Sequence, residues 1–391
     1  PLLSDDPIPM SDARPPRTYM SVPHMSGDEQ PFIADAFASN WLSSVGPSLD
    51  GFEREVAERL GGVHTLGVSS GTAAIHLVLR YAGVRAGDRV AVQSATFAGG
   101  AFPVVYQGAE PVFIDSEPVT GGMDPALAAE YLDEAARRNE LPRAMIVAHL
   151  YGQHCDVDPI AEACERHGVV LIEDAAESLG ATYRGRQTAT RAPLSALSFN
   201  GNKIITTTGG GMCVVRDAAA IPVLRKWSTQ SKEAKVEYEH VELGYNYRMS
   251  NVLAAIGRGQ LRVLDERVRQ RQAVFARYAE AFAGVPGIAM QEEAAWGTHT
   301  RWLSVAFLDA SVHGRTPDDV VVALERDNIE ARPIWRPMHT QPLFAGCRAV
   351  GGAVSEQLFR TGICLPSSSR LAATPDVQDR VIEKLLAFLT R

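Results

Sequence analysis

The sequence predicts an α/β protein in which a large domain with a mostly parallel sheet is followed by a smaller α+β domain. Three observations predict this fold class. Short apolar runs alternate with helical patterns from residue 64 to residue 215, which is typical of a parallel sheet with helices on its faces. A long charged helical pattern follows, and then a mixture of strand and helix patterns. The length of 391 residues also exceeds what one small hydrophobic core supports.

The region before the sheet contains an arm and two helical patterns. Residues 1–22 are rich in proline and show no periodicity, so we expect an extended N-terminal arm. Apolar residues recur at helical spacing from Asp28 to Ser39 and from Phe52 to Leu60, and the turn-rich segment WLSSVGPSLD lies between them. We therefore expect two helices joined by a loop.

The predicted sheet has seven strands. Their apolar runs are TLGVS, RVAVQ, PVFID, AMIVAHL, VVLIED, SALSF and GMCVV. Helical patterns such as TAAIHLVLRYAG and DPIAEACERHG lie between several of these runs. The last run follows Gly209, Gly210 and Gly211 closely, so we expect it to be antiparallel to its neighbour.

The C-terminal part begins with one long charged helical pattern from about Ser250 to Phe282. It is followed by an alternating strand, TRWLSVAFLD, a helix, DDVVVALERD, a proline-broken loop, RPIWRPMHTQPLF, and a final helix, VQDRVIEKLLAFL. We expect the long helix to link two domains. The predicted division is an arm over residues 1–22, a large domain over 23–255, and a linking helix with a small domain over 256–391.

Composition and charge exclude several classes of protein. Hydrophobic residues make up 46% and charged residues 21% of the chain, as in an ordinary globular protein. The formal net charge of −8 leaves no basic surplus for a phosphate backbone, so we expect no nucleic acid partner. No apolar run approaches the roughly 18–20 residues of a membrane span. We expect a cytoplasmic protein with no membrane partner, and the five scattered cysteines and the lack of metal-binding motifs predict no metal site.

Lys203 is the first candidate for chemistry. It lies in the segment SFNGNKIITTTGGGM, directly after an apolar strand and in a polar turn rich in glycine. One interpretation is an ordinary surface charge. The other is a Schiff-base lysine, whose amine must be deprotonated and shielded from water to attack an aldehyde.

Asp174 favours the second interpretation. It ends the apolar strand of VVLIEDAAESLG, 29 residues before Lys203. Catalysis by pyridoxal phosphate (PLP) needs a carboxylate against the pyridine nitrogen, so that the protonated ring accepts electrons from a carbanion. Both residues follow strands of the predicted sheet, and ligands bind at the carboxyl ends of such strands. The alternative is that Asp174 only caps a helix.

A third motif, VSSGTAAIHL, leads from a strand into a helix through Ser69 to Thr72. Helix N-termini with glycine and hydroxyl residues bind phosphate through free backbone N–H groups and the helix dipole. The alternative is an ordinary turn between a strand and a helix. The order of the three motifs favours a phosphate site.

These motifs, in this order, resemble the DegT/DnrJ/StrS family of nucleotide-sugar aminotransferases, which have the PLP-dependent transferase fold type I. The resemblance extends over nearly the whole chain, through WLSSVGPSLDGFE, SSGTAAIHL, HLYGQHCDVDPI, IEDAAESLG, SFNGNKIITTTGGGM, GYNYRMSNVLAAIGRGQL and RPMHTQP. It implies an aminotransferase with PLP as its cofactor. The amino group is expected to pass from glutamate to a keto sugar by a two-step exchange.

The resemblance also implies a role for individual residues. Lys203 matches the lysine that holds the cofactor and moves the proton, and Asp174 matches the partner of the pyridine nitrogen. Glu177 stands near the cofactor's phenolic oxygen, and Phe97 matches the aromatic residue that stacks on the ring, although a core phenylalanine is the alternative. The phosphate contacts are expected from Gly71, Thr72 and Ser198. Asn246, in GYNYR, matches an asparagine that reaches the phosphate of the partner subunit, which implies a homodimer with shared active sites.

The glycine run after Lys203 and the RPIWRPMH segment look most like the bacillosamine-pathway branch of the family. This branch aminates C4 of UDP-2-acetamido-4-keto-2,4,6-trideoxyglucose with glutamate as donor. Trp335, Arg336 and His339 are then expected to face the UDP-linked keto sugar, and a proline-pinned surface loop is the alternative. His149, which ends an apolar strand, either lines the cleft or is a core histidine.

Two other functions are compatible with the same fold. A PLP-dependent sugar dehydratase removes a hydroxyl group, but the relatives with that activity have histidine in place of the lysine, so Lys203 argues against it. A regulatory relative would keep the fold without the chemistry. The joint presence of Lys203, Asp174 and the phosphate turn argues against this third function.

Overall fold

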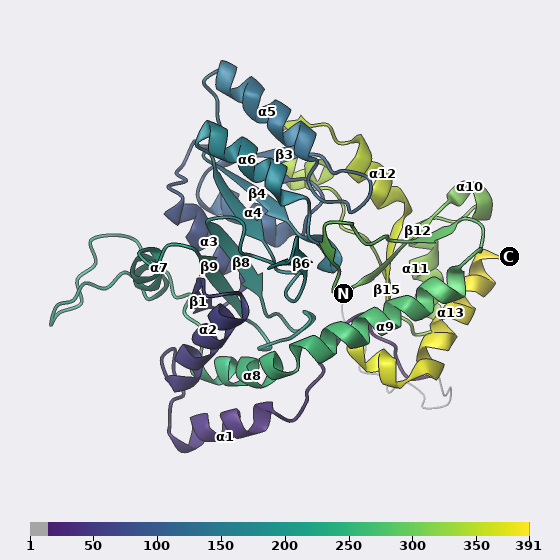
Figure 1. Cartoon of the computed structure of the whole chain (residues 1–391), viewed down its shortest axis with the longest axis horizontal. Coiled ribbons are helices and arrows are strands. Elements are labelled where there is room, and N and C mark those ends of the chain that lie inside the picture. The colour runs from purple at the N-terminus through teal and green to yellow at the C-terminus, as the bar shows by residue number, and fades with distance from the viewer. Residues whose placement is uncertain (1–14, 391) are drawn as a thin grey trace, which may run out of the picture.

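The computed structural model of the chain describes residues 15–390 (Figure 1). Most of the arm predicted over residues 1–22 therefore lies outside the described residues. Its described part runs along the smaller domain, where Thr18 forms a parallel bridge with Ile329 and Arg17 pairs with Glu325.

An eight-stranded sheet forms the centre of the larger domain, with the strand order β1-β9-β8-β5-β4-β2-β3-β14. Each neighbouring pair is parallel except the two pairs that involve β9, so the antiparallel orientation predicted for that strand is confirmed. All seven predicted strands are present, and β14 is an addition from the C-terminal part. The strands are β1 (His64–Val68), β2 (Arg89–Gln93), β3 (Glu110–Ile114), β4 (Ala144–Ala148), β5 (Val170–Asp174), β8 (Leu194–Ser198), β9 (Gly211–Val215) and β14 (Ala349–Val350).

Helices cover both faces of this sheet because successive strand residues point to opposite faces and are apolar on each. Val90 and Val92 of β2 pack into one core with α3, α4 and α7, whereas Ala91 packs into a second core with α5 and α6. These helices are α3 (Gly71–Tyr81), α4 (Ala98–Tyr106), α5 (Pro125–Arg137), α6 (Val157–His167) and α7 (Ala220–Ser228).

The loop expected over WLSSVGPSLD is shorter than predicted. Helix α1 covers Glu29–Ala38 as expected, but α2 spans Pro47–Arg59 and so includes the segment PSLD. Proline at the first helical position has the backbone angle of a helix and lacks only an N–H that would be unpaired there. Gly46, at φ 148°, ends the loop before it.

The single long helix predicted from Ser250 to Phe282 is two helices. Helix α8 (Asn251–Arg262) packs against α1 and α2, and α9 (Leu264–Phe282) continues into the smaller domain (Figure 1). The break lies at Val263, which serves both as the C-cap of α8 and as the N-cap of α9. Gly259 permits the close packing, because a Cβ there would lie 2.5 Å from Glu29 Cα in α1. The periodicity predicts one helix, but its two halves pack against different parts of the molecule and form two helices.

The smaller domain is built on a four-stranded antiparallel sheet with the order β10-β12-β15-β13. The C-terminal half of α9 packs on it together with α11 and α13 in a separate hydrophobic core. Its elements are β10 (Ile288–Met290), β12 (Ser304–Leu308), β13 (Arg332–Pro333), β15 (Gly362–Leu365), α10 (Ala310–His313), α11 (Pro317–Arg326), α12 (Ala353–Thr361) and α13 (Pro375–Leu389).

A third, small sheet consists of β6 (Thr182–Tyr183), β7 (Arg186–Gln187) and β11 (Gly297–Thr298). In it, the hairpin of β6 and β7, which follows β5 in the chain, pairs with β11, which precedes β12. The domain boundary at residue 255 stays a prediction. Strand β14 comes from the C-terminal part of the chain but pairs with β3 at the edge of the large sheet. Between residues 15 and 390, no helix is both long and apolar enough to span a bilayer.

Candidate active site

One cavity of about 250 Å³ lies at the carboxyl edge of the large sheet. Five strands end there and are followed by polar or aromatic side chains, because the carboxyl ends of parallel strands meet at one edge. The residues that follow them and line the cavity are Ser69 after β1, Phe97 after β2, His149 after β4, Asp174 at the end of β5, and Ser198 at the end of β8. The sequence motifs that are far apart in the chain therefore converge.

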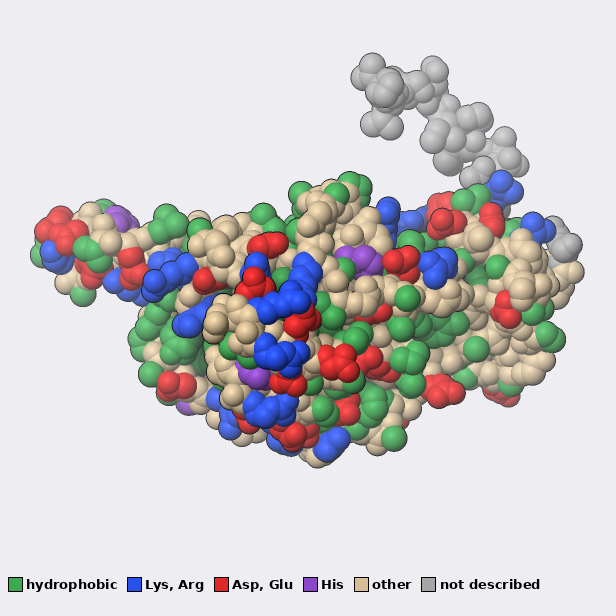
Figure 2. Space-filling model, turned by 90° about the horizontal axis from the view of Figure 1, so that it is seen from above, with side chains coloured by type: hydrophobic (Ala, Val, Ile, Leu, Met, Phe, Trp, Pro, Cys, Tyr) green, Lys and Arg blue, Asp and Glu red, His purple; other side chains and the backbone are tan. Residues whose placement is uncertain are grey.

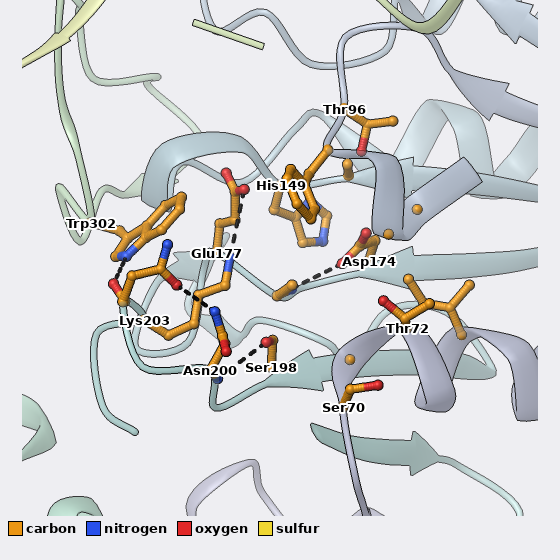
Figure 3. A pocket seen from close by; sticks show the side chains of 18 of the residues that line it. Ser70, Thr72, Thr96, His149, Asp174, Glu177, Ser198, Asn200, Lys203 and Trp302 are labelled. Carbon is orange, nitrogen blue, oxygen red and sulfur yellow. Dashed lines mark hydrogen bonds and ion pairs between the residues drawn. The ribbon is translucent and has the colours of Figure 1, made fainter. Parts of the chain in front are cut away.

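Lys203 and Glu177 face each other on one side of this cavity, as Figure 3 shows. The distance from Lys203 Nζ to Glu177 Oε1 is 3.7 Å, and the lysine side chain is 11% exposed. Burial lowers the pKa of the Lys203 amine, and the carboxylates of Glu177 and Asp174 partly oppose that shift. Burial raises the pKa of Glu177. The enclosed site thus favours the uncharged amine that a nucleophile or base requires.

Glu177 is held by two hydrogen bonds from neighbouring segments. Its Oε2 accepts from the Tyr151 backbone N–H at 2.8 Å, and its Oε1 accepts from the Trp335 indole N–H at 3.2 Å. The carboxyl group is therefore fixed in front of Lys203. It also joins the large domain to the proline-broken loop of the smaller one.

Asp174 lies on the other side of the cavity, near Ser70 and Thr72 (Figure 3). Its Oδ1 accepts from the Ala176 backbone N–H at 3.1 Å. No hydrogen bond to Oδ2 is found from residues 15–390, and a Cβ at Gly100 would lie only 3.0 Å from it. Burial raises the pKa of Asp174. A buried carboxylate with one oxygen free toward a cavity fits a protonated ring nitrogen.

The predicted phosphate turn forms the floor of the cavity at the N-terminus of α3. Ser70 caps this helix, since its hydroxyl accepts from the Ala73 backbone N–H at 3.0 Å. The turn is packed tightly, because a Cβ at Gly71 would lie 3.0 Å from Ser198 Cβ and a Cβ at Gly211 would lie 2.3 Å from the Ser70 carbonyl. Thr72 and Ser198 line the same space. The dipole of an 11-residue helix and the hydroxyl groups around its start suit a phosphate.

Phe97 and Trp335 form an aromatic wall. Their ring centroids are 5.3 Å apart, and Trp335 also stacks on Tyr151 at 5.9 Å. Phe97 is 54% exposed, so it is not the core residue that the alternative interpretation describes. Its ring is available to stack on a flat ligand.

Three of the predicted residues do not line the cavity. Asn246 lies in a projecting segment, where it pairs with Thr229 and accepts a hydrogen bond from Gln230. Arg336 is exposed and bonded to Thr340. His339 contacts Ser94 Oγ at 2.6 Å and Glu356 at 3.2 Å.

His149 lines the cavity and is also fully bonded in the core. Its Nε2 contacts Glu173 at 2.9 Å, and its ring stacks on His154 with the centroids 3.6 Å apart. His154 contacts the same carboxylate at 3.2 Å. His149, His154 and Cys155 have ligand-type atoms within 4.8 Å of one another, but both imidazoles are bonded to Glu173 and burial raises the pKa of the Cys155 thiol. We assign no metal to this group.

Trp302, Asn200 and Asn202 also line the cavity and were not among the predicted site residues. The two asparagines belong to the turn before Lys203, but the sequence does not tell toward which side of the turn their side chains point. Trp302 lies 99 residues after Lys203 in the segment TRWLSVAFLD, whose alternation indicates a strand and nothing else. No pattern in the sequence connects it to the site.

Comparison with known proteins adds independent information. Residues 23–386 match the description of the DegT/DnrJ/EryC1/StrS aminotransferase family. The chain is 49% identical over 374 residues to EpsN of Bacillus subtilis strain 168, named a candidate pyridoxal phosphate-dependent aminotransferase, with 95% of each chain covered. It is 35% identical over 377 residues to GDP-perosamine synthase of Caulobacter vibrioides, with 96% of this chain and 99% of that one covered. The solved structure of the aminotransferase TlmJ of Streptoalloteichus hindustanus has a TM-score of 0.85 at 29% identity, covering 95% of this chain and 99% of that chain.

Proposed function

The chain belongs to the DegT/DnrJ/EryC1/StrS family of PLP-dependent sugar aminotransferases, and we propose that it transfers the amino group of glutamate to the C4 keto group of a nucleotide-linked 4-keto-6-deoxy sugar. The observation that carries this proposal is the position of Lys203 and Asp174 at two sides of one cavity, with the phosphate turn below them. These are the groups that a pyridoxal ring needs at its aldehyde, its nitrogen and its phosphate.

The cavity fits the cofactor by the chemistry of its donors. The N-terminus of α3 with Gly71 and Thr72, together with Ser198, would hold the phosphate. Asp174 Oδ2 would hold the ring nitrogen, Phe97 would cover the ring face, and Lys203 would bind the aldehyde as a Schiff base. When bound, PLP supplies an aldehyde that takes up the amino group and a ring that accepts electrons from the reacting carbon.

Lys203 performs the proton transfer in this proposal. Its Nζ would take the proton from the α-carbon of the donor, and in the second half of the exchange it would deliver a proton to the carbon that becomes C4 of the amino sugar. The amine must be neutral for this step, and its burial favours that form. Glu177, 3.7 Å away, is placed to hold Nζ toward the cavity and to stay close to the phenolic oxygen.

Asp174 would keep the ring nitrogen protonated when the cofactor is bound. Burial alone would favour its neutral form, which is the direction of its pKa shift. A cationic N–H group facing Oδ2 reverses that preference, because an opposite charge at hydrogen-bond distance stabilises the carboxylate. Asp174→Asn would therefore leave the ring unprotonated and reduce turnover far more than it reduces cofactor binding.

We propose UDP-2-acetamido-4-keto-2,4,6-trideoxyglucose as the acceptor, with Trp335 in contact with it and Arg336 and His339 near the entrance. The support is the RPIWRPMH segment, which places Trp335 in the wall beside Phe97. The name of the relative GDP-perosamine synthase points to a GDP-linked product in that protein. The nucleotide is therefore the part of the proposal that needs the most direct test.

A panel of UDP-, dTDP- and GDP-linked 4-keto sugars tests the acceptor. Each is incubated with the enzyme and glutamate, and the product is identified by mass and NMR while 2-oxoglutarate is measured. We expect one equivalent of 2-oxoglutarate for each amino sugar from the UDP substrate, and none with Lys203→Ala. Loss of a sugar hydroxyl without glutamate consumption would support the dehydratase instead, and failure to bind PLP would support a regulatory relative.

We also propose a cytoplasmic homodimer in which Asn246 completes the partner's site. The segment between Thr229 and Asn246 projects from one end of the molecule (Figures 1 and 2). It exposes four large apolar residues, Val236, Tyr238, Val241 and Leu243. Exposed apolar groups on such a projection favour contact with a second chain. Mixing inactive Lys203→Ala and Asn246→Ala chains would restore about a quarter of the activity if the sites are shared, and none if each site is complete in one chain.

A further inference from the structure

Trp302 contacts Lys203 from the smaller domain, and nothing in the proposed function uses it. The Lys203 Nζ lies 4.1 Å from the centroid of the Trp302 ring (Figure 3). The indole is 1% exposed, so its ring face is withdrawn from water. When the amine is charged, the quadrupole of a desolvated indole attracts it, so this contact partly opposes the lowering of the Lys203 pKa by burial. Figure 3 shows Trp302 and Asp174 on opposite sides of the Lys203 amine.

The indole N–H of Trp302 acts on the backbone of the same turn. It donates to the carbonyl of Asn202 at 2.7 Å, and Asn202 directly precedes Lys203. The same carbonyl accepts a second hydrogen bond, at 2.6 Å, from the hydroxyl of Ser21 in the N-terminal arm. Two donors from distant parts of the chain thus hold the residue before the lysine.

A buried arginine of α9 connects these two donors. Arg271 Nη2 donates to Ser21 Oγ at 3.0 Å, and Nη1 donates to the carbonyl oxygens of Trp302 and Ser367. All the hydrogen bonds of Arg271 found within residues 15–390 go to neutral oxygens, and burial lowers its pKa to about 9. A buried guanidinium without a counterion is costly, so its hydrogen bonds to this network must stabilise it.

The backbone beside Trp302 is also constrained. Arg301 has a φ of 54°, a region that side chains other than glycine rarely adopt. Its guanidinium is held at 3.6 Å over the Phe275 ring and donates to the Gln291 carbonyl at 2.8 Å. Such strain persists only where surrounding contacts impose it, and these two contacts hold the residue directly before Trp302 in place.

We propose that Trp302 is a positioning residue for Lys203. Its ring holds the amine within the cavity, and its N–H, together with Ser21, fixes the carbonyl of the preceding residue. The arm, α9 and the smaller domain thereby determine where the lysine of the large domain stands. This proposal rests on the role of Lys203 in the proposed function, but it concerns the geometry and basicity of the lysine rather than the identity of the sugar.

Competitive acetylation of the cofactor-free protein tests the ring contact. The chain has five lysines, so peptide mass spectrometry resolves the labelling of Lys203 across a pH series against exposed Lys232. Glu177 and Asp174 are the ionisable groups that face the amine. The π face of Trp302 favours the charged form of the Lys203 amine. Trp302→Leu removes this face and should lower the pKa of Lys203 by about 0.5 to 1.5 units. Trp302→Phe keeps an aromatic face and should shift it less.

Trp296→Phe is the matched control. Its indole N–H also donates to a backbone carbonyl, that of His154 at 2.8 Å, but it lies outside the cavity. The Lys203 profile should match the wild type in this variant. Wild-type labelling of Lys203 in Trp302→Leu would overturn the role of the ring. If the leucine variant does not fold, Trp302→Met, whose side chain is long and flexible but has no π face, takes its place with the same expected shift.

The N–H contact is tested in the PLP-loaded enzyme by the single-turnover reaction with glutamate. Trp302→Phe and Ser21→Ala each remove one donor to the Asn202 carbonyl and should slow the step about 3- to 10-fold, as expected for the loss of one hydrogen bond. Cofactor affinity should change less than this rate. Two unchanged rates would refute the positioning role. If the wild type itself did not react with glutamate, the proposed donor would be wrong, whereas the labelling result would stand.

Discussion

Gly211 offers a sharp test of the phosphate turn. It lies in β9 between β1 and β8, and a Cβ there would lie 2.3 Å from the Ser70 carbonyl carbon and oxygen and 2.4 Å from the Gly71 nitrogen. Carbon atoms pack at about 3.5 to 4.0 Å, so Gly211→Ala must displace the start of α3 by about 1 Å. The contacts are with backbone atoms, which cannot turn aside as a flexible side chain does.

Two consequences of Gly211→Ala have different magnitudes. Overpacking of this kind costs about 1 to 3 kcal/mol of the free energy of unfolding. If this turn holds the cofactor phosphate as proposed, a shift of about 1 Å would also break one or two hydrogen bonds to it, each of about 1.5 to 3 kcal/mol. Because about 1.4 kcal/mol is a tenfold change, we expect the Kd for PLP to rise at least about tenfold.

Gly209→Ala is the control for this prediction. It lies in the same glycine triplet, but a Cβ there meets nothing within 4 Å. The assays are urea unfolding of the cofactor-free protein and titration with PLP followed by absorbance. The reasoning is refuted if Gly211→Ala binds PLP with the wild-type Kd, or if Gly209→Ala loses as much affinity as Gly211→Ala.

Three further predictions concern stability, each measured by urea unfolding. Glu173→Gln should lower the free energy of unfolding by about 3 kcal/mol or more, because the Glu173 carboxylate accepts hydrogen bonds from the Arg191 and Ala192 backbone and faces two imidazoles. A decrease below about 1 kcal/mol would contradict this prediction. Burial lowers the pKa of His76 from 6.5 to about 4, so between these pH values the unfolded chain is protonated at His76 while the folded chain is not. Stability therefore falls as the pH falls through this range, and His76→Phe should lessen that fall. An identical pH profile in the variant would disprove the prediction. Phe52→Ala should cost about 3 to 5 kcal/mol, since the ring is fully buried and meets Phe199 edge to face at 5.0 Å, and a near-neutral result would show that the core refills the space.

Much of the fold was predictable because its signals are local. The seven apolar runs of the large sheet became strands within one or two residues, and the family resemblance is confirmed by the comparisons. The errors arose where packing decides. The break at Val263 separates a helix that contacts α1 and α2 from one that contacts the smaller domain, and no local pattern records which neighbour a helical turn will have.

The candidate site divides in the same way. Asp174, Ser198 and the Gly71 turn follow strands directly, so the rule that parallel strands end at one edge places them together. Asn246 and His339 could not be placed by that rule, and the structure puts both outside the cavity wall. For His149 the sequence offered two alternatives, a residue that lines the cleft and a core histidine. The structure shows both at once, because His149 lines the cavity and is bonded to the buried Glu173.

The sequence by itself determined the fold class and the family, and it singled out the lysine and aspartate that both line the cavity. Each of these depends on residue types at short spacings that local backbone preferences turn into strands and turns. Only the tertiary structure decided what surrounds the lysine. Trp302, Ser21 and Arg271 come from a loop, an arm and a helix that lie 99, 182 and 68 residues away along the chain. Trp302 contacts Lys203 itself, Ser21 contacts the carbonyl of Asn202 before it, and Arg271 joins Ser21 to Trp302. Contacts made across such distances along the chain depend on how the whole molecule packs.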